Sequence, residues 1–287
     1  MRAALRRLTS GRWATAWWLL SAVAIVAIGL TQIDLADVGD ALSSLSVPLA
    51  ALSWATLLAG QVISGVRWRV IGPRLGARSS TRWFVRAYLR GSFYNAFLPT
   101  GIGGDAMRIA ALRHDVGLKD ATRSVVIDRA SGLAAICLAA GACLPFTNYL
   151  DDVPALRVAL AALSLTASIV LAIVLARRGL AGFVGWTLLF MAVWFGGIWV
   201  LARALDIELD AAALPIVTLI VAAAIALPIS IGATGTREAG FVVALAPLAV
   251  GTDQAVALGI SFGVVLALVG LVGAPLSVAA EPAEASG

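Results

Sequence analysis

Two short blocks of the sequence place an arginine nine residues after a proline, with a glycine-rich break between the two. The first runs from Pro99 to Arg108 and reads PTGIGGDAMR, and the second runs from Pro228 to Arg237 and reads PISIGATGTR. A guanidinium group forms paired hydrogen bonds with a phosphate. A helix that begins after such a break offers free N–H groups to the same anion. The blocks therefore predict two anion-binding points, each at the start of a helix.

Each of these arginines has a carboxylate close by in the sequence. Asp105 stands three residues before Arg108, and Glu238 directly follows Arg237. The carboxylates could neutralise the arginines and only hold the two blocks together. They could also bind and release protons, which would couple proton movement to that of the anion. Both alternatives stay open beside direct anion binding.

The composition places these blocks in a membrane protein. Of the 287 residues, 61% are hydrophobic and 13% are charged, and the mean hydropathy is +0.96. No soluble domain needs so much apolar surface. About 20 apolar residues cross a hydrocarbon core of about 30 Å. The runs that meet this criterion are 14–30, 48–66, 124–144, 154–176, 180–202, 211–227 and 255–279, and all of them except 211–227 are expected to cross.

Basic residues predict the orientation, because lysine and arginine near helix ends stay in the cytoplasm. Four arginines and no acid precede the first expected crossing, whereas residues 34–40 contain three aspartates and no base. Residues 67–90 then contain seven arginines and no acid. We therefore expect a multi-pass protein of the cell (inner) membrane with a cytoplasmic amino terminus.

Some segments are expected to enter the membrane without crossing it. The stretch from Arg82 to Arg123 is basic at both ends, so residues from about 82 to 116 should turn back at the first block as a re-entrant hairpin. If the second half copies the first, residues 211–250 form the equivalent hairpin, entered from the other side. The rival interpretation makes 211–227 a full crossing and places the carboxyl terminus outside.

The expected fold is an all-α integral membrane protein with a single membrane domain over residues 1–287. Two repeats, at 14–146 and 154–279, would be inverted relative to each other, each with three transmembrane helices and one re-entrant helical hairpin. The substrate site of such folds lies between the repeats near the bilayer midplane. The expected hairpin tips are Pro99, Gly101, Gly103, Gly104, Pro228, Gly232 and Gly235.

Several motifs resemble the flippase-like family named after the transmembrane region of lysylphosphatidylglycerol synthase. The similar positions are Arg67-Trp68, Asn95 to Arg108, Arg129 with Gly132, Pro228 to Gly232, and Arg237-Glu238. The resemblance extends over nearly the whole chain and implies a lipid-translocating module. Full-length synthases of the family carry a soluble aminoacyl-transfer domain after this region, whereas this sequence stops at Gly287. Synthetic activity is therefore not expected.

These observations predict a membrane lipid transporter, flippase-like or scramblase-like. It would move an anionic phospholipid or polyprenyl-phosphate-linked lipid head group between leaflets. Topological or interfacial roles stay open for Arg67 and Arg129. The alternatives are a non-catalytic scaffold or regulator of a lipid-modifying or glycosyl-transfer enzyme, and a small-solute carrier. The residues expected at the head group are Arg67, Asn95, Asp105, Arg108, Arg129, Arg237 and Glu238.

The sequence offers little for catalysis. It has one histidine, no Gly-x-x-x-x-Gly-Lys-Ser/Thr loop for a nucleotide, and no Cys or His cluster with metal-ligand spacing. Enzymatic activity, a cofactor and a metal are therefore not expected. The net charge of +5 is explained by topology and attraction to anionic lipid, so nucleic acid is not an expected partner. The expected partners are membrane lipids, together with a second copy of the chain or a membrane enzyme.

Overall fold

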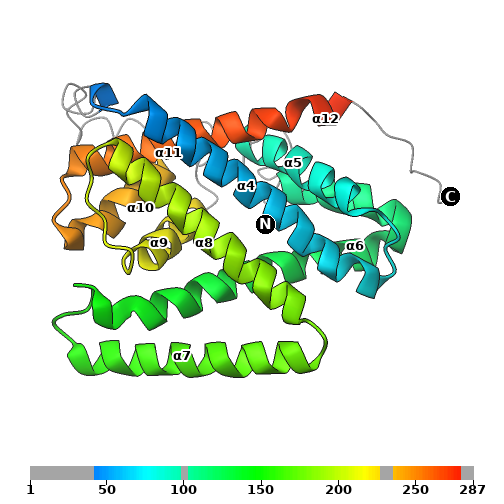
Figure 1. The fold of residues 1–287 in the computed structure, drawn as a ribbon, viewed down its shortest axis with the longest axis horizontal. Coiled ribbons are helices and arrows are strands. Elements are labelled where there is room, and N and C mark those ends of the chain that lie inside the picture. Colours follow the sequence, from blue (N-terminus) through cyan, green and yellow to red (C-terminus); the bar gives the residue numbers. More distant parts are fainter. Residues whose placement is uncertain (1–41, 98–102, 227–234, 279–287) are drawn as a thin grey trace, which may run out of the picture.

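The computed structural model describes residues 42–97, 103–226 and 235–278, and every regular element in these ranges is a helix (Figure 1). The longer helices are α4 (Val47–Ile71), α5 (Thr81–Phe97), α6 (Gly103–Cys143), α7 (Pro154–Arg177), α8 (Ala181–Ala204) and α11 (Thr252–Val272). The shorter ones are α9 (Leu214–Ala226), α10 (Thr236–Leu245) and α12 (Ala274–Val278), with single 3₁₀ turns at Gly72–Leu75, Leu144–Phe146 and Ala246–Leu248. The expected crossing at 14–30 lies outside the described residues.

Within the described part, five helical segments are long and apolar enough to cross a membrane. They overlap the remaining five expected crossings, and they are Val47–Leu75, Gly103–Phe146, Pro154–Arg177, Ala181–Ala204 and Thr252–Leu276. The protein is thus an all-helical, multi-pass membrane protein. Its α7 lies along one edge of the bundle (Figure 1), and large apolar side chains such as Leu163 and Ile169 are exposed on it. Such a surface suits contact with lipid.

The segment 211–227, which the sequence allows to be either part of a hairpin or a full crossing, contains the short helix α9. Helix α9 has 13 residues, which at 1.5 Å per residue span about 20 Å. Helix α10 has 10 residues and spans about 15 Å. Both lengths fall below the roughly 30 Å of a hydrocarbon core. Over the residues that the structure describes, neither helix is therefore long enough to cross a membrane alone.

Helix α6 is bent at Gly117, where φ is +82° and ψ is 162°. Residues other than glycine rarely adopt such a backbone conformation. The bend separates a first arm, 103–116, from a longer second arm, 118–143. A similar interruption separates α10 from α11, where Ala249 has a φ of +58° and Gly251 precedes the first turn of α11. Each half of the chain thus contains a short arm, a break and a long helix.

Helices α4 and α8 pack against each other in opposite directions (Figure 1). The backbone N–H of Ser46, before α4, donates a hydrogen bond of 2.8 Å to the carbonyl of Ala204 at the end of α8. At the other end, Arg74 donates one of 2.6 Å to the carbonyl of Gly179, before α8. Buried apolar side chains such as Leu57 fill the contact between the two helices. The pair forms the centre of the bundle.

Two further contacts connect the halves of the chain. Helix α5 packs on α11, and α6 packs on α9. A core cluster that includes Trp68, Phe84 and Leu112 joins α4, α5 and α6. A second cluster, with Leu201 and Leu258 among its members, joins α4 to α8, α9, α10 and α11. Because lipid tails are as apolar as these side chains, close packing stabilises the arrangement mainly through van der Waals contacts between the helices.

Candidate functional site

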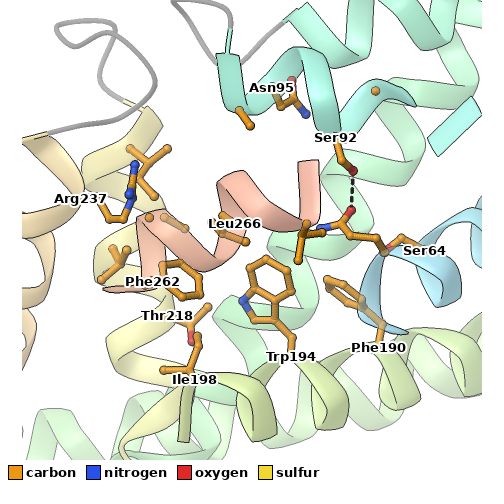
Figure 2. A pocket seen from close by; sticks show the side chains of 18 of the residues that line it. Ser64, Ser92, Asn95, Phe190, Trp194, Ile198, Thr218, Arg237, Phe262 and Leu266 are labelled. Atoms are coloured by element: carbon orange, nitrogen blue, oxygen red, sulfur yellow. Dashed lines mark hydrogen bonds between the residues drawn. The ribbon is translucent and has the colours of Figure 1, made fainter. Parts of the chain in front are cut away.

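A cavity of about 660 Å³ lies between the helices, and its walls come from α4, α5, α6, α8, α9, α10 and α11 (Figure 2). Both block arginines line it. Arg108 is contributed by the first arm of α6, and Arg237 by the first turn of α10. Their sequence separation is large, yet the fold brings them to the walls of one cavity. The two blocks of the sequence therefore each contribute one arginine to the same cavity.

Asp128, in the second arm of α6, lies at the centre of a buried ion network. Its Oδ1 is 2.8 Å from Nη2 of Arg67, and its Oδ2 is 2.7 Å from Nη2 of Arg108. The Arg67 Nε also donates to Oδ1 at 3.2 Å. The Asp128 side chain is 1% exposed and both arginines are 3% exposed. The Asp128 carboxylate therefore partly neutralises two buried guanidinium groups and connects α4 to both arms of α6.

Asp105 extends this network to the cavity. Its Oδ1 is 3.4 Å from Nη1 of Arg108, and its Oδ2 is 2.8 Å from Nε of Arg129. Arg129 is 55% exposed and Asp105 is 16% exposed, so this end of the network is accessible. The network thus runs Arg67, Asp128, Arg108, Asp105, Arg129, and its three cations exceed its two carboxylates by one positive charge.

Aromatic rings hold the buried guanidinium groups in place. The Arg108 guanidinium carbon lies 4.3 Å from the ring centroid of Trp68 and 4.2 Å from that of Tyr88. The guanidinium of Arg67 lies 5.2 Å from the ring centroid of Phe190. Such cation–π contacts are worth about 0.5–2 kcal/mol, with the larger values at desolvated sites. Arg108 is therefore fixed on its faces by rings and on its edges by carboxylates.

Arg237 is held differently in the second half. It is 8% exposed, and its Nη1 lies 3.8 Å from Oε1 of Glu238. Its guanidinium lies against the bare backbone of α11, because a Cβ added to Gly263 would come 1.6 Å from Nη1. Glu238 also accepts a hydrogen bond from the backbone N–H of Gly235, whose φ is +85°. Glu238 therefore serves the amino end of α10.

The first arm of α6 begins with a comparable cap. The side-chain oxygen of Asn95 accepts a hydrogen bond of 2.8 Å from the backbone N–H of Gly104. A Cβ on Gly104 would lie 2.1 Å from the carbonyl oxygen of Gly91. Only glycine at this position lets α5 and α6 approach so closely. Asn95 therefore satisfies part of the helix end that the sequence assigned to an anion.

Apolar surface and unsatisfied hydroxyl groups complete the cavity. The rings of Trp194 and Phe262 meet with their centroids 6.0 Å apart, between the Arg237 side and the Ser92 side of the cavity (Figure 2). The buried hydroxyls of Ser64 and Thr218 line the cavity and have no hydrogen-bond partner among the residues that the structure describes. Buried polar groups usually have partners. The walls therefore suit an amphiphile that carries hydrogen-bonding oxygens and a negative charge.

Five of the predicted head-group residues line the cavity, namely Asn95, Asp105, Arg108, Arg129 and Arg237. The other two lie behind the wall: Arg67 supports Asp128, and Glu238 caps α10. Of the predicted tips, Gly103 and Gly104 begin α6 and Gly235 precedes α10. The predicted tips outside the described residues are Pro99, Gly101, Pro228 and Gly232.

Asp128, which organises the site, is not among the site residues expected from the sequence. A usable signal was present, because an acidic residue within the expected crossing 124–144 is costly and marks a functional position by default. Its partners could not be inferred, since Arg67 and Arg108 are distant along the chain. Within the described ranges, no group of three or more His, Cys, Asp and Glu side chains is placed to hold a metal ion.

A family model described as the lysylphosphatidylglycerol synthase TM region matches residues 16–181, which is more than half of the 287 residues. The chain belongs to this family. The match contains the whole network from Arg67 to Arg129 but ends before the second block, so it is shorter than the resemblance expected from the motifs. No curated protein and no solved structure gives a significant match. Membership connects this membrane protein with lipid handling.

Proposed function

We propose that the protein is a flippase-like or scramblase-like lipid transporter without catalytic activity. It takes the phosphate of an anionic phospholipid or a polyprenyl-phosphate-linked lipid into the cavity while the tail stays in the bilayer. The observation that carries this proposal is that Arg108 and Arg237 line the same cavity. A charged side chain at mid-bilayer costs about 2.5–3.5 kcal/mol on insertion scales, and a phosphate that forms paired hydrogen bonds offsets such a cost.

The charge balance of the site favours an anion. The network from Arg67 to Arg129 has one cation more than it has carboxylates. Arg237 and Glu238 add one charge of each sign. A phosphodiester would neutralise the excess charge, and the Ser64 and Thr218 hydroxyls could donate to its oxygens. The aromatic wall at Trp194 suits the first carbons of a lipid tail.

The helix lengths and contacts support two inverted repeats over 14–146 and 154–279. In this arrangement α4 corresponds to α8, α5 to α9, and the two arms of α6 to α10 and α11. Equivalent helices at the centre should then pack antiparallel, as α4 and α8 do. The contact of α5 with α11 is likewise the counterpart of the contact of α9 with α6. These relations favour re-entrant hairpins at about 82–116 and 211–250 over a full crossing by 211–227.

The bend at Gly117 supports the depth assigned to the charges. Arg108 lies nine residues before this glycine and Asp128 eleven residues after it. If the bend lies at the cytoplasmic surface, both charges lie about 14–17 Å inside the membrane. That depth is near the middle of a core of about 30 Å. The re-entrant model thus places the ion network where an isolated charge would be most costly.

The ends of the central helix pair support a cytoplasmic amino terminus in a cell membrane. Arg74 bonds to Gly179, so the basic segments 74–82 and 177–178 lie at one end of the bundle. The end where Ser46 meets Ala204 leads into residues 206–210, which contain three acids and no base. The positive-inside rule assigns the basic end to the cytoplasm.

Accessibility labelling tests this topology. After replacement of Cys137 and Cys143, single cysteines at Glu208 and Ser286 are labelled in intact cells with a reagent that does not cross membranes. The inverted model predicts labelling at position 208 and protection at 286. Labelling at position 286 from outside would instead support the crossing by 211–227.

Reconstitution tests the transport function. The purified protein in liposomes should move fluorescently labelled phosphatidylglycerol between leaflets, and Arg237→Ala should reduce that rate to the background of protein-free vesicles. Arg203→Ala is the matched control, because Arg203 is 42% exposed and pairs with Glu208 away from the cavity. An undiminished rate in a folded Arg237→Ala protein contradicts the proposal. Co-purification of a lipid-modifying enzyme without any transport would support the scaffold alternative.

A further inference from the structure

Asp105 differs from Asp128 in how firmly it is held. The contacts of Asp128 with Arg67 and Arg108 are 2.8 and 2.7 Å long, and its carboxylate is almost fully buried. Asp105 makes one long contact of 3.4 Å with Arg108 and one of 2.8 Å with the exposed Arg129. It also lines the cavity, as Asp128 does not. Asp105 is thus the accessible carboxylate of the network.

The position of Asp105 has the chemistry of a phosphate site. A carboxylate that pairs with two guanidinium groups occupies the same donors that would bind a phosphate. Arg129 can follow an incoming anion, since more than half of its side chain is exposed. Arg108 cannot move far, because Trp68, Tyr88 and Asp128 hold it. The two donors therefore combine one fixed cation with one adaptable cation.

We propose that the Asp105 carboxylate and the phosphate of the lipid compete for Arg108 and Arg129. This inference rests on the proposed function and concerns the regulation of the same site. When the phosphate enters, Asp105 turns away from the two guanidinium groups. When the phosphate leaves, Asp105 returns and neutralises them. Asp105 therefore lowers the affinity for the lipid and favours its release.

Transport gives a physical reason for such a competitor. A translocated group must bind well enough to enter but weakly enough to leave. A buried cluster of arginines without a competing anion would hold a phosphate tightly, since charge-assisted hydrogen bonds strengthen in a site that excludes water. The Asp105 carboxylate also pairs with Arg108 and Arg129 after the lipid phosphate has left, so these cations are not left without a counter-charge.

Binding to Asp105→Asn tests this competition. The variant removes the charge at nearly constant shape, and Asp152→Asn is the matched control because Asp152 is exposed in the loop before α7. Dihexanoyl phosphatidylglycerol and glycerol 3-phosphate are titrated separately into the full chain in an uncharged maltoside detergent. We expect Asp105→Asn to bind the lipid at least about threefold more tightly than the unmodified protein, and Asp152→Asn to bind it equally.

The two probes separate a lipid from a free phosphate. Tighter binding of both probes means that the phosphate group alone exchanges with Asp105. Tighter binding of the lipid alone means that the exchange needs the tail in the cavity. Either result supports competition. Equal or weaker binding of both probes by Asp105→Asn overturns the competition. A carboxylate with a purely structural role does not compete with the probes, so its removal would not tighten their binding.

A second measurement uses the unmodified protein, so that it does not depend on folding of the variant. Carbodiimide coupling of Asp105 to a small amine, followed by mass spectrometry, should become faster when dihexanoyl phosphatidylglycerol is present. An unchanged or slower reaction overturns the competition. The proposed function fails separately if neither probe binds the unmodified protein, or if Arg237→Ala leaves lipid binding intact.

Discussion

Arg108 and Asp128 belong to the same helix, α6, and their side chains meet at 2.7 Å although 20 residues separate them. In a straight helix these positions would be about 30 Å apart. The bend at Gly117 folds the two arms of α6 toward each other and makes the contact possible. The ion network therefore depends on the backbone of a single glycine as much as on the charged side chains.

Gly117→Ala should destabilise the protein, because the alanine would have to adopt a φ of about +82°. Strain of this kind costs about 1–3 kcal/mol. We expect a lower melting temperature in detergent, measured by intrinsic tryptophan fluorescence. Gly182→Ala is the control, since a Cβ there meets no atom within 4 Å and the glycine has no positive φ. Equal melting temperatures of the two variants would argue against strain at the bend.

Asp128→Asn should be more damaging than removal of any exposed acid. It leaves Arg67 and Arg108 buried with reduced compensation. Removing one partner of a buried ion pair lowers the free energy of unfolding by about 3–5 kcal/mol. Thermal unfolding in detergent should show a large loss of stability relative to Asp152→Asn. If the variant and the unmodified protein have the same melting temperature, water or other polar groups already compensate the charges of the two arginines.

Gly263→Ala should displace Arg237, because the added Cβ would overlap its Nη1. Lipid binding measured by native mass spectrometry should fall about as far as in Arg237→Ala. The double variant should bind no worse than Arg237→Ala alone, since the two changes remove the same interaction. Gly196→Ala is the matched control, because a Cβ there meets nothing within 4 Å. Additive losses would show that Gly263 acts independently of Arg237.

Because its hydroxyl is partly buried, Tyr149 should make the protein less stable in strongly alkaline solution. Its hydroxyl donates to the carbonyl of Ala244, and burial raises the pKa of Tyr149 to about 12. The ordinary pKa is about 10, so the folded state holds the proton more tightly. Its stabilising contribution is complete below about pH 10 and disappears as the pH approaches 12. The drop in melting temperature between these values should be smaller in Tyr149→Phe, and an identical pH profile would exclude Tyr149 as its source.

The cavity is lined by several helices, and the sequence identifies each of them only by its own local pattern. Pro-Gly breaks and apolar length are local properties, so the sequence alone predicts re-entrant hairpins at about 82–116 and 211–250 and long helices around them. It also identifies Arg108 and Arg237 as cations in apolar surroundings. Local patterns are therefore sufficient to predict the membrane class, the helices and the family.

Partners and accessibility are not local properties. Asp128 stabilises Arg67 and Arg108 only because α6 bends and packs on α4, and Arg67 lies behind the cavity wall rather than in it. The sequence by itself determined that the chain is helical, apolar and interrupted at matching places, because hydropathy and helix breaking act within a few residues. Only the tertiary structure decided which charges meet, because ion pairing requires contacts between helices that are distant along the chain.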